Sequence, residues 1–394
     1  MSPDFNFAFV LGPSGSHFLC LDVESELVSH EHVDWTALDE FVEQNRGKFI
    51  ATLLAYDLKN DIEKLDSNNP KLMDAPKLIY FVPKSVYKIQ GADFEWVYGV
   101  NHDDLVKAIL GPVDEQPASF ELHPSISREQ YIQHVESAKN EIQLGNCYEL
   151  NFCQNFEASG VQIDDAWRVF KYLQQSSQAP FSSFFKWGNF VMMGASPERF
   201  IQRLGHKLIS QPIKGTRPRK ANPEEDEAMK RELLNNTKER AENVMIVDLV
   251  RNDLTRVAKT GSIHVDELFG IYSFHAVHQM ISTISCELQE NIKHADIIKA
   301  LFPMGSMTGA PKISAMQIIE RLENFKRGWY SGSVGLIEPN GDFDMNVVIR
   351  TLLYDADNQY LCCPVGSAIT IMSEPELEYE ECLMKINRIL SLFA

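Results

Sequence analysis

The first third of the chain alternates short apolar runs with polar turns. Apolar runs at residues 49–54 and 78–82 are separated by segments rich in Asn, Pro and Asp, a pattern typical of strands and small helices. A stretch containing Gly and Pro at residues 111–117 predicts a linker. We therefore expect an N-terminal α/β region over residues 1–120 that is integrated with the main fold, followed by a second domain over residues 121–394.

Helix-start signals recur through the rest of the chain. Ser127 and Gln130 form a capping pair ahead of an apolar face with helical spacing. Asn222, which precedes a proline and two glutamates, predicts another helix start. The helical pattern after it should break at residues 235–237. Residues 373–376 match a capping box and predict a final helix.

Strands with short turns dominate the C-terminal half. Residues 334–337 and 347–354 are apolar and flank a turn that contains Asn340-Gly341, which suits a tight hairpin. A further strand is expected over residues 360–371. Consecutive strands with short connections pair antiparallel. Because the helices come in blocks and not one per strand, the predicted fold class is α+β.

The composition narrows the possible partners. The chain has 37 basic and 55 acidic residues, a formal charge of −18, which disfavours nucleic acid and anionic membranes as partners. Seven cysteines in no regular spacing do not indicate a disulfide framework, and no cysteine lies in a glutaminase-type elbow. The N-terminus has no basic leader, and the longest uncharged run is too polar for a membrane span. We expect a cytoplasmic protein.

One lysine lies in a tight turn. Pro212 restricts the backbone before it, and Gly215 would let the chain approach a ligand closely, so Lys214 should lie at a strand end. Three further cations occur at residues 217–220. Neighbouring cations lower the pKa of an amine, which would make Lys214 nucleophilic near neutral pH. The alternative is an ordinary solvated basic loop.

Two predicted helices carry paired carboxylates. Glu239 and Glu242 are three residues apart, and Glu378, Glu381 and Lys385 share one arc of the final helix. Carboxylates from two helices could together hold Mg²⁺, which takes few carboxylates and completes its shell with water and substrate oxygens. Each pair taken alone could equally be a solvated helix face.

Three other features are candidates for anion binding or for packing. The turn at residues 305–312 lacks the phosphate-loop pattern, but it leads into a helix and could bind anions generally. Arg350 is expected in an apolar strand, where it needs either an internal or a bound carboxylate. His278 lies in an apolar segment, and a hydrogen-bonded core histidine is its default interpretation.

Taken together, these segments resemble the chorismate-utilising enzymes, most closely the branch that comprises component I of aminodeoxychorismate synthase. The resemblance covers about residues 125–392, and the first 120 residues match only weakly. The matching stretches are residues 145–151, 195–200, 212–216, 241–243, 248–253, 305–312 and 328–332, together with His278, Arg350 and the helix bearing Glu378, Glu381 and Lys385.

The resemblance implies two large antiparallel sheets packed together with helices outside, and an Mg²⁺-dependent chorismate site. It implies that Glu242 and Glu381 ligate the metal, with Glu239 and Glu378 in support through water. Lys385 would help hold the ring carboxylate, while Arg350 and Tyr330 would hold the enolpyruvyl carboxylate. The remaining residues expected at the substrate are Gly215, Thr216, His278, Thr308 and Gly366.

The residue at position 214 separates members of this family. Anthranilate synthases usually carry alanine there, whereas component I of aminodeoxychorismate synthase carries lysine. The implied mechanism is covalent: Lys214 adds to ring C2 while Glu198, as general acid, assists departure of the 4-hydroxyl, and ammonia then adds at C4 and expels the lysine.

The resemblance also implies a partner. Ammonia would come from a separate glutamine amidotransferase subunit, since none is recognisable in this sequence, and the product would feed p-aminobenzoate and folate biosynthesis. Anthranilate synthase component I is the nearest alternative, followed by isochorismate or salicylate synthase. A non-catalytic chorismate-binding subunit is an alternative of a different class.

Overall fold

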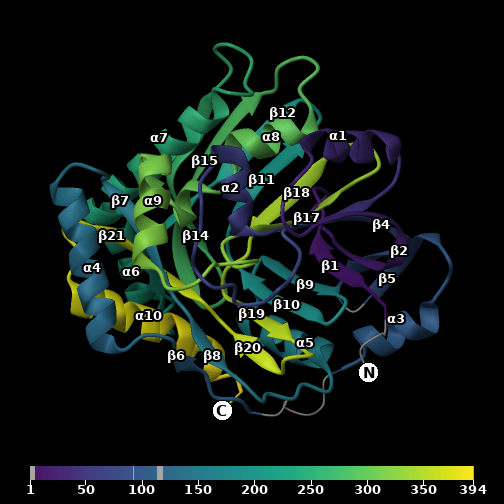
Figure 1. Ribbon diagram of the computed structural model, residues 1–394, viewed down its shortest axis with the longest axis horizontal. Helices are drawn as coiled ribbons and strands as arrows, with labels where there is room; N and C mark the ends of the chain where they lie inside the picture. The colour runs from purple at the N-terminus through teal and green to yellow at the C-terminus, as the bar shows by residue number, and fades with distance from the viewer. Residues whose placement is uncertain (1–4, 92, 113–118, 394) are drawn as a thin grey trace.

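The computed structural model describes residues 5–91, 93–112 and 119–393 (Figure 1). The predicted linker falls partly outside these residues, at 113–117. In chain order, the strands of the N-terminal half are β1 (Phe7–Leu11), β2 (His17–Ser29), β3 (Ile50–Leu54), β4 (Leu78–Gln90), β5 (Asp93–Gly99), β6 (His123–Pro124), β7 (Glu149–Gln154), β8 (Phe156–Ala158), β9 (Phe181–Trp187) and β10 (Phe190–Ser196). Those of the C-terminal half are β11 (Arg199–Leu204), β12 (Lys207–Gln211), β13 (Ile213–Pro218), β14 (His264–Ser273), β15 (Val277–Glu287), β16 (Gly309–Ala310), β17 (Ser333–Ile337), β18 (Phe343–Val347), β19 (Thr351–Asp355), β20 (Tyr360–Cys362) and β21 (Val365–Thr370).

Helices lie outside the strands and gather mainly on one side, where α4, α6, α9 and α10 face away from the N-terminal strands (Figure 1). The α-helices are α1 (Trp35–Gln44), α2 (Lys59–Glu63), α3 (Asp103–Leu110), α4 (Arg128–Gln143), α5 (Ala166–Ser177), α6 (Pro223–Asn235), α7 (Thr237–Leu254), α8 (His294–Leu301), α9 (Lys312–Leu322) and α10 (Pro375–Leu390). Two short 3₁₀ turns are η1 (Tyr56–Leu58) and η2 (Gly305–Met307).

The strands pair antiparallel along one long path. The path runs β6-β8-β20-β19-β10-β9-β1-β2-β4-β3-β17-β18-β11-β12-β15, and β13 and β14 also pair with β15. A separate sheet has the order β16-β7-β21. The N-terminal strands therefore lie in the same sheet network as later ones, through β1 with β9 and β3 with β17. The predicted α+β class, with large antiparallel sheets and helices outside, is confirmed.

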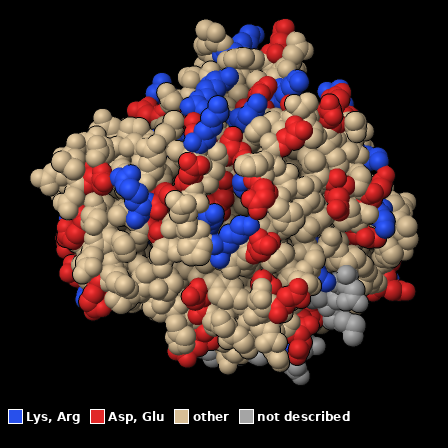
Figure 2. Space-filling view, viewed as in Figure 1, with Lys and Arg blue, Asp and Glu red and all other residues tan. Residues whose placement is uncertain are grey.

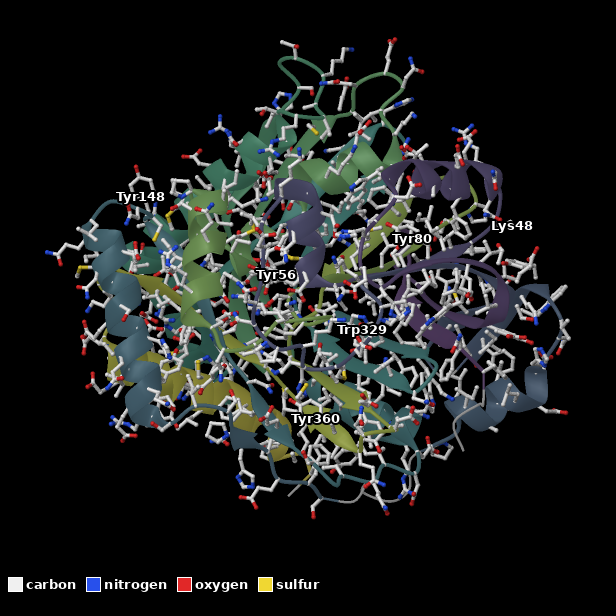
Figure 3. The ribbon with its side chains drawn as sticks, viewed as in Figure 1. Lys48, Tyr56, Tyr80, Tyr148, Trp329 and Tyr360 are labelled. Carbon is white, nitrogen blue, oxygen red and sulfur yellow. The ribbon has the colours of Figure 1, made fainter. Side chains whose placement is uncertain are left out.

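Large aromatic side chains fill the centre of the molecule. Tyr56, Tyr80 and Trp329 are buried there, whereas Tyr148 points outward at the edge (Figure 3). The Trp329 indole donates to the Pro76 carbonyl at 2.8 Å, so its polar atom is satisfied inside the core. Burial of such rings stabilises the fold by removing large apolar surfaces from water.

The local helix signals are confirmed. Ser127 and Gln130 form the predicted capping box at the start of α4. Asn222 caps α6, and the predicted break falls between α6 and α7, where Asn236 caps the second helix. The capping box predicted for the last helix is wrong: Glu374 is the N-cap of α10 without a side-chain cap, and the Ser373 hydroxyl accepts from the Thr370 amide instead.

Two strand predictions are also wrong. The strand expected over residues 347–354 is interrupted after β18, and Arg350, with a φ of 52°, lies in the break before β19. The strand expected over residues 360–371 divides into β20 and β21, which belong to different sheets. Both interruptions lie beside the cavity described below.

Charge is spread over the surface. Acidic side chains are scattered across the visible face, with basic ones between them (Figure 2). None of the helices in the described part of the chain is both long and apolar enough to cross a bilayer.

Candidate active site

A cavity of about 400 Å³ opens between β13, β21, α7 and α10. Twelve of the fourteen residues predicted for the site line it: Glu198, Lys214, Gly215, Thr216, Glu239, Glu242, Tyr330, Arg350, Gly366, Glu378, Glu381 and Lys385. They come from segments up to 187 residues apart in the sequence, between Glu198 and Lys385. The fold therefore gathers cations and carboxylates into one space.

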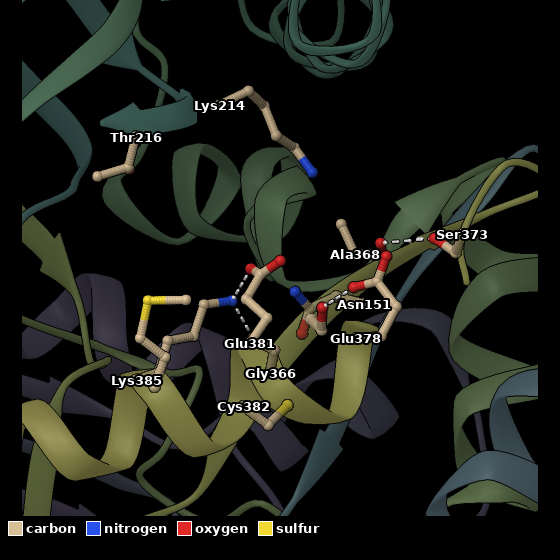
Figure 4. Close-up of polar contacts among 12 residues, drawn as sticks. Asn151, Lys214, Thr216, Gly366, Ala368, Ser373, Glu378, Glu381, Cys382 and Lys385 are labelled. Atoms are coloured by element: carbon tan, nitrogen blue, oxygen red, sulfur yellow. Dashed lines mark hydrogen bonds and ion pairs between the residues drawn. The ribbon is translucent and has the colours of Figure 1, made fainter. Parts of the chain in front are cut away.

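Lys214 lies near the start of β13 and is buried. The preceding strand β12 ends at Gln211, as predicted, and Gly215 has a φ of 87°. A side chain at Gly215 would meet Leu233 at 2.8 Å and Glu239 at 3.0 Å, so only glycine fits this turn. In Figure 4 the Lys214 amine reaches toward the helix that carries Glu378 and Glu381.

The predicted cause of Lys214 activation is wrong. Burial alone would lower its pKa, but Glu149, Glu242 and Glu198 outweigh burial and raise it. The Lys214 ammonium donates to the carboxylate of Glu149. Two of the three nearby cations are already neutralised, because Arg217 pairs with Glu232 and Glu239, and Arg219 pairs with Asp226. Lys214 is therefore a protonated amine in this arrangement.

Glu198 has the properties of a general acid. It lies between β10 and β11, is buried, and lines the cavity together with Lys214. Burial raises the pKa of Glu198 from 4.5 to about 7, although Ser306, Lys214 and the Ile213 amide oppose the rise. A carboxyl with this pKa holds a proton near neutral pH and can donate it.

The acidic pairs of α7 and α10 face each other across the cavity. The ammonium of Lys238 lies between them, 3.9 Å from Glu242 and 4.0 Å from Glu378. Glu381 pairs with Lys385 at 2.6 Å, and Glu378 accepts from the Ser367 hydroxyl. Burial raises the pKa of Glu242 to about 7. Carboxylates on two facing helices favour a positive charge between the helices.

The donor chemistry of these carboxylates suits Mg²⁺. All four glutamates line one cavity, and carboxylate oxygens are the ligands that this ion prefers. The position of Lys238 shows that a cation is accommodated between α7 and α10. Within residues 5–91, 93–112 and 119–393, no three or more His, Cys, Asp or Glu side chains are grouped closely enough to hold a metal ion. Three of the four glutamates are engaged by protein donors.

Arg350 faces the cavity without an acidic partner. In the described part of the chain, no carboxylate lies within ion-pair distance of its guanidinium, and burial, followed by the charge of Arg388, lowers its pKa. An isolated buried guanidinium is costly unless an anion joins it. From the sequence, the partner of Arg350 could be either a carboxylate of the protein or one of a bound ligand. The structure favours a ligand carboxylate.

On the wall of the cavity formed by β21, the backbone at Gly366 lies close to neighbouring side chains. The Gly366 carbonyl accepts from the Lys385 ammonium at 2.8 Å. A side chain at Gly366 would meet Asn151 at 2.4 Å. Tyr330 is buried, and burial raises the pKa of its phenol, which therefore stays a hydrogen-bond donor.

Two predicted residues do not reach the cavity. The His278 ring contacts Ser273 at 2.8 Å and Asp226 at 2.9 Å. This arrangement is the hydrogen-bonded core histidine that was its default interpretation. The Thr308 hydroxyl donates to carbonyls at 3.3 and 3.2 Å on its own turn. Because successive strand residues face opposite sides, the neighbour of His278, Gln279, lines the cavity instead.

Sequence reasoning missed four residues at or beside the site: Glu149, Lys238, Gln279 and Ser306. Gln279 and Ser306 line the cavity, and each has a buried side-chain oxygen without a hydrogen-bond partner in the described residues. One signal was available for Glu149. It lies in an apolar run, where a buried carboxylate requires a cation.

Comparisons with known proteins bear on the family to which this chain belongs. The family described as chorismate binding enzyme matches residues 14–391. Component 1 of aminodeoxychorismate synthase from Klebsiella aerogenes is 42% identical over 266 residues, which is 68% of this chain and 58% of that protein. The Escherichia coli protein of the same name is 40% identical over 281 residues, covering 71% of this chain and 61% of that protein. The match thus spans about three-fifths of the length of these relatives.

Solved structures share the fold. Anthranilate synthase component I from Streptococcus pneumoniae superposes with a TM-score of 0.81 at 24% identity, covering 96% of this chain and 92% of that one. The menaquinone-specific isochorismate synthase of Escherichia coli gives 0.78 at 18% identity, covering 100% and 90%. The likeness extends over the N-terminal region, which resembled the family only weakly in sequence. This chain belongs to the chorismate-binding enzyme family.

Proposed function

We propose that this protein is component I of an aminodeoxychorismate synthase, which converts chorismate and ammonia to 4-amino-4-deoxychorismate. The observation that carries the proposal is the buried amine of Lys214, which lines one cavity with Glu198 and four further glutamates. The names of relatives about 40% identical support the same activity.

The cavity suits a small dianion in spite of the acidic surface. Arg350, which has no acidic partner among the described residues, would hold the enolpyruvyl carboxylate, with Tyr330 donating a hydrogen bond. Lys385 lies at the opposite wall and would hold the ring carboxylate. Two cations at separate points fix the orientation of the ring, which places the reacting carbons relative to Lys214.

Mg²⁺ is the proposed cofactor. Glu242 and Glu381 would hold it, with Glu239 and Glu378 supporting through water. When bound, the ion would withdraw electrons through the ring carboxylate and so favour addition of a nucleophile to the ring.

The covalent steps belong to Lys214 and Glu198. The neutral amine of Lys214 would add to ring C2 while Glu198 protonates the departing 4-hydroxyl, which leaves as water. Ammonia would then add at C4 and expel the lysine, and the resulting carboxylate of Glu198 would take the surplus proton. Glu198 ends the cycle protonated, as it began.

Ammonia would come from a glutamine amidotransferase subunit, and the product would enter p-aminobenzoate and folate synthesis. The designation component 1 of the relatives supports a second component.

Product analysis tests this function. Purified protein with chorismate, Mg²⁺ and ammonium should yield 4-amino-4-deoxychorismate, which a pyruvate-eliminating lyase converts to p-aminobenzoate. Omission of ammonium is the control. Formation of anthranilate and pyruvate would refute the proposal in favour of anthranilate synthase. Absence of any chorismate turnover would favour a non-catalytic subunit.

A further inference from the structure

The resting state of Lys214 poses a chemical problem. Carboxylates around the cavity outweigh burial and raise its pKa, so the amine carries a proton that must leave before it can act as a nucleophile. The Lys214 side chain is buried, so bulk water is a poor acceptor for that proton. A protein base in contact with the Lys214 nitrogen is therefore required.

Glu149 is the acceptor that touches this nitrogen. It is the first residue of β7 and is 1% exposed. Its Oε1 accepts from the Lys214 ammonium. Its backbone is fixed on both sides, because Glu149 lies opposite Ala310 in β16 and opposite Thr370 in β21. The carboxylate is thus presented to Lys214 by the small three-stranded sheet and not by a mobile loop.

The other oxygen of Glu149 is unusual. Within the described residues, Oε2 is buried and has no hydrogen-bond partner. A structural ion pair in a dry site normally satisfies its remaining lone pairs. Leaving this oxygen free weakens the preference for the charged form of the carboxylate. Transfer of the proton from Lys214 neutralises both groups, which a desolvated site favours.

The competing bases fit less well. Glu198 and Glu242 also raise the pKa of Lys214, but only through charge, and in the described chain Glu149 alone among the carboxylates hydrogen bonds to its nitrogen. Burial raises the pKa of Glu198 to about 7, so a substantial fraction of it holds a proton near neutral pH, which suits the acid role and makes it a poorer base. Glu242 faces Lys238 on its own helix at 3.9 Å.

We propose that Glu149 is the catalytic base that takes the proton from Lys214 before the lysine adds to the ring and returns it when the lysine departs. This role rests on the proposed function. The proton moves from the Lys214 nitrogen to Glu149, and the freed electron pair forms the bond to C2. The 4-hydroxyl leaves as water with the proton of Glu198. After ammonia expels the neutral amine of Lys214, Glu149 gives its proton back, and the excess proton of the new C4 amine passes to Glu198.

The first test measures the rate of adduct formation on Lys214 by mass spectrometry of the intact protein, with chorismate and Mg²⁺ and without ammonia. The variant Glu149→Gln keeps the shape and removes the base. Its adduct rate near neutral pH should fall by about 10²- to 10⁴-fold, and its rate relative to the wild-type rate at the same pH should rise with pH as hydroxide replaces the missing base. Glu149→Asp should recover part of the rate.

Asp253→Asn is the matched control. Asp253 pairs with the buried ammonium of Lys312 at 2.5 Å outside the cavity lining, so its loss removes an equivalent pair without touching Lys214. This variant should form the adduct at the wild-type rate per folded molecule. Equal adduct rates and equal pH profiles for wild type and Glu149→Gln would overturn the base role. A faster rate in Glu149→Gln would also overturn it, because Glu149 would then only suppress the lysine.

A second measurement does not depend on chorismate. Carbamylation of Lys214 by cyanate, followed by peptide mass spectrometry, reports the pKa of the amine in the free protein. In Glu149→Gln the midpoint should move to lower pH, because the first of the carboxylates that raise the pKa is gone. An unmoved midpoint would contradict the coupling between the two residues. If wild type forms no adduct but the midpoint moves, the proposed function fails while the coupling stands.

Discussion

Two buried lysines in this molecule have the same kind of partner but different surroundings. Lys312, at the start of α9, donates to Asp253 at 2.5 Å and also to the Leu301 carbonyl at 3.1 Å. Lys214 donates to Glu149 and otherwise faces a cavity of about 400 Å³. The first pair is closed by further protein contacts, whereas the second leaves one carboxylate oxygen without a partner among the described residues.

The difference separates a structural ion pair from a reactive one. Both lysines are about equally buried, with side chains 9% exposed, so burial alone does not identify the reactive residue. Lys214 differs in three respects. Several carboxylates surround it, one oxygen of its partner Glu149 has no hydrogen-bond partner among the described residues, and a cavity lies beside its amine. These are conditions under which a proton can move and a substrate can approach.

Removing each lysine should give opposite phenotypes. Lys214→Ala should lower the rate of product formation by at least about 10³-fold, because the nucleophile is lost. Lys312→Ala should keep its activity per folded molecule but lose about 3–5 kcal/mol of stability, because Asp253 stays buried without its cation. Denaturant unfolding and product assays on both variants measure these effects. A stable, inactive Lys312→Ala would break the comparison.

The variant Glu198→Gln tests whether Glu198 is the general acid. Adduct formation should fall by about 10²-fold, because the departing hydroxyl loses its proton donor. The pKa of Glu198 rises from 4.5 to about 7 on folding, so the folded state binds the extra proton between these values. Stability should therefore fall as pH rises through this window in wild type.

The Glu198→Gln variant should show a smaller fall in stability over the same window. Urea unfolding at several pH values measures the difference. An identical pH dependence in the two proteins would contradict the raised pKa of Glu198.

Arg350→Gln tests the unpaired cation. The KM for chorismate should rise about 10- to 100-fold through loss of a charge-assisted bond to a carboxylate. Stability should not fall, since no acidic partner in the described residues is left behind. Steady-state kinetics and thermal unfolding on one preparation distinguish the two effects. A destabilised variant with an unchanged KM would instead point to an internal partner for Arg350.

Lys238→Met should have the smallest effect. Lys238 lies between Glu242 and Glu378 and is half exposed. Its removal should strengthen Mg²⁺ binding by about two- to five-fold, because one competing positive charge is lost in a partly screened position. Calorimetric titration with Mg²⁺ measures the change, with Lys230→Met, which lies outside the cavity lining, as control. Weaker binding in Lys238→Met would show that Lys238 supports the site and does not compete for it.

Local signals in the sequence were sufficient for several elements. The cap at Ser127, the cap at Asn222 and the break at Asn236 were predicted because each depends on residues within one turn. Most of the site came from the family resemblance, and the structure brings those residues to one cavity. The features that escaped prediction depend on distant residues. Glu149 and Lys214 are 65 residues apart, so no local pattern could reveal that they pair.

Arg350 shows a second limit of the sequence. Its apolar neighbours predict a strand, but the backbone turns to a φ of 52° there, at a residue that lines the cavity. The predicted effect of nearby cations on Lys214 failed for a similar reason. Arg217, three residues after Lys214, forms ion pairs with Glu232 of α6 and Glu239 of α7, so its charge does not act on the amine alone.

The central claim is that the amine of Lys214 forms a bond to the substrate ring. The most direct measurement is peptide mass spectrometry of the wild-type protein after incubation with chorismate and Mg²⁺ in the absence of ammonia, with Lys214→Ala in parallel. The account predicts that the peptide containing Lys214 gains the mass of chorismate less one water, and that the variant gains none. An unmodified Lys214 in protein that still makes aminated product on addition of ammonium would contradict it.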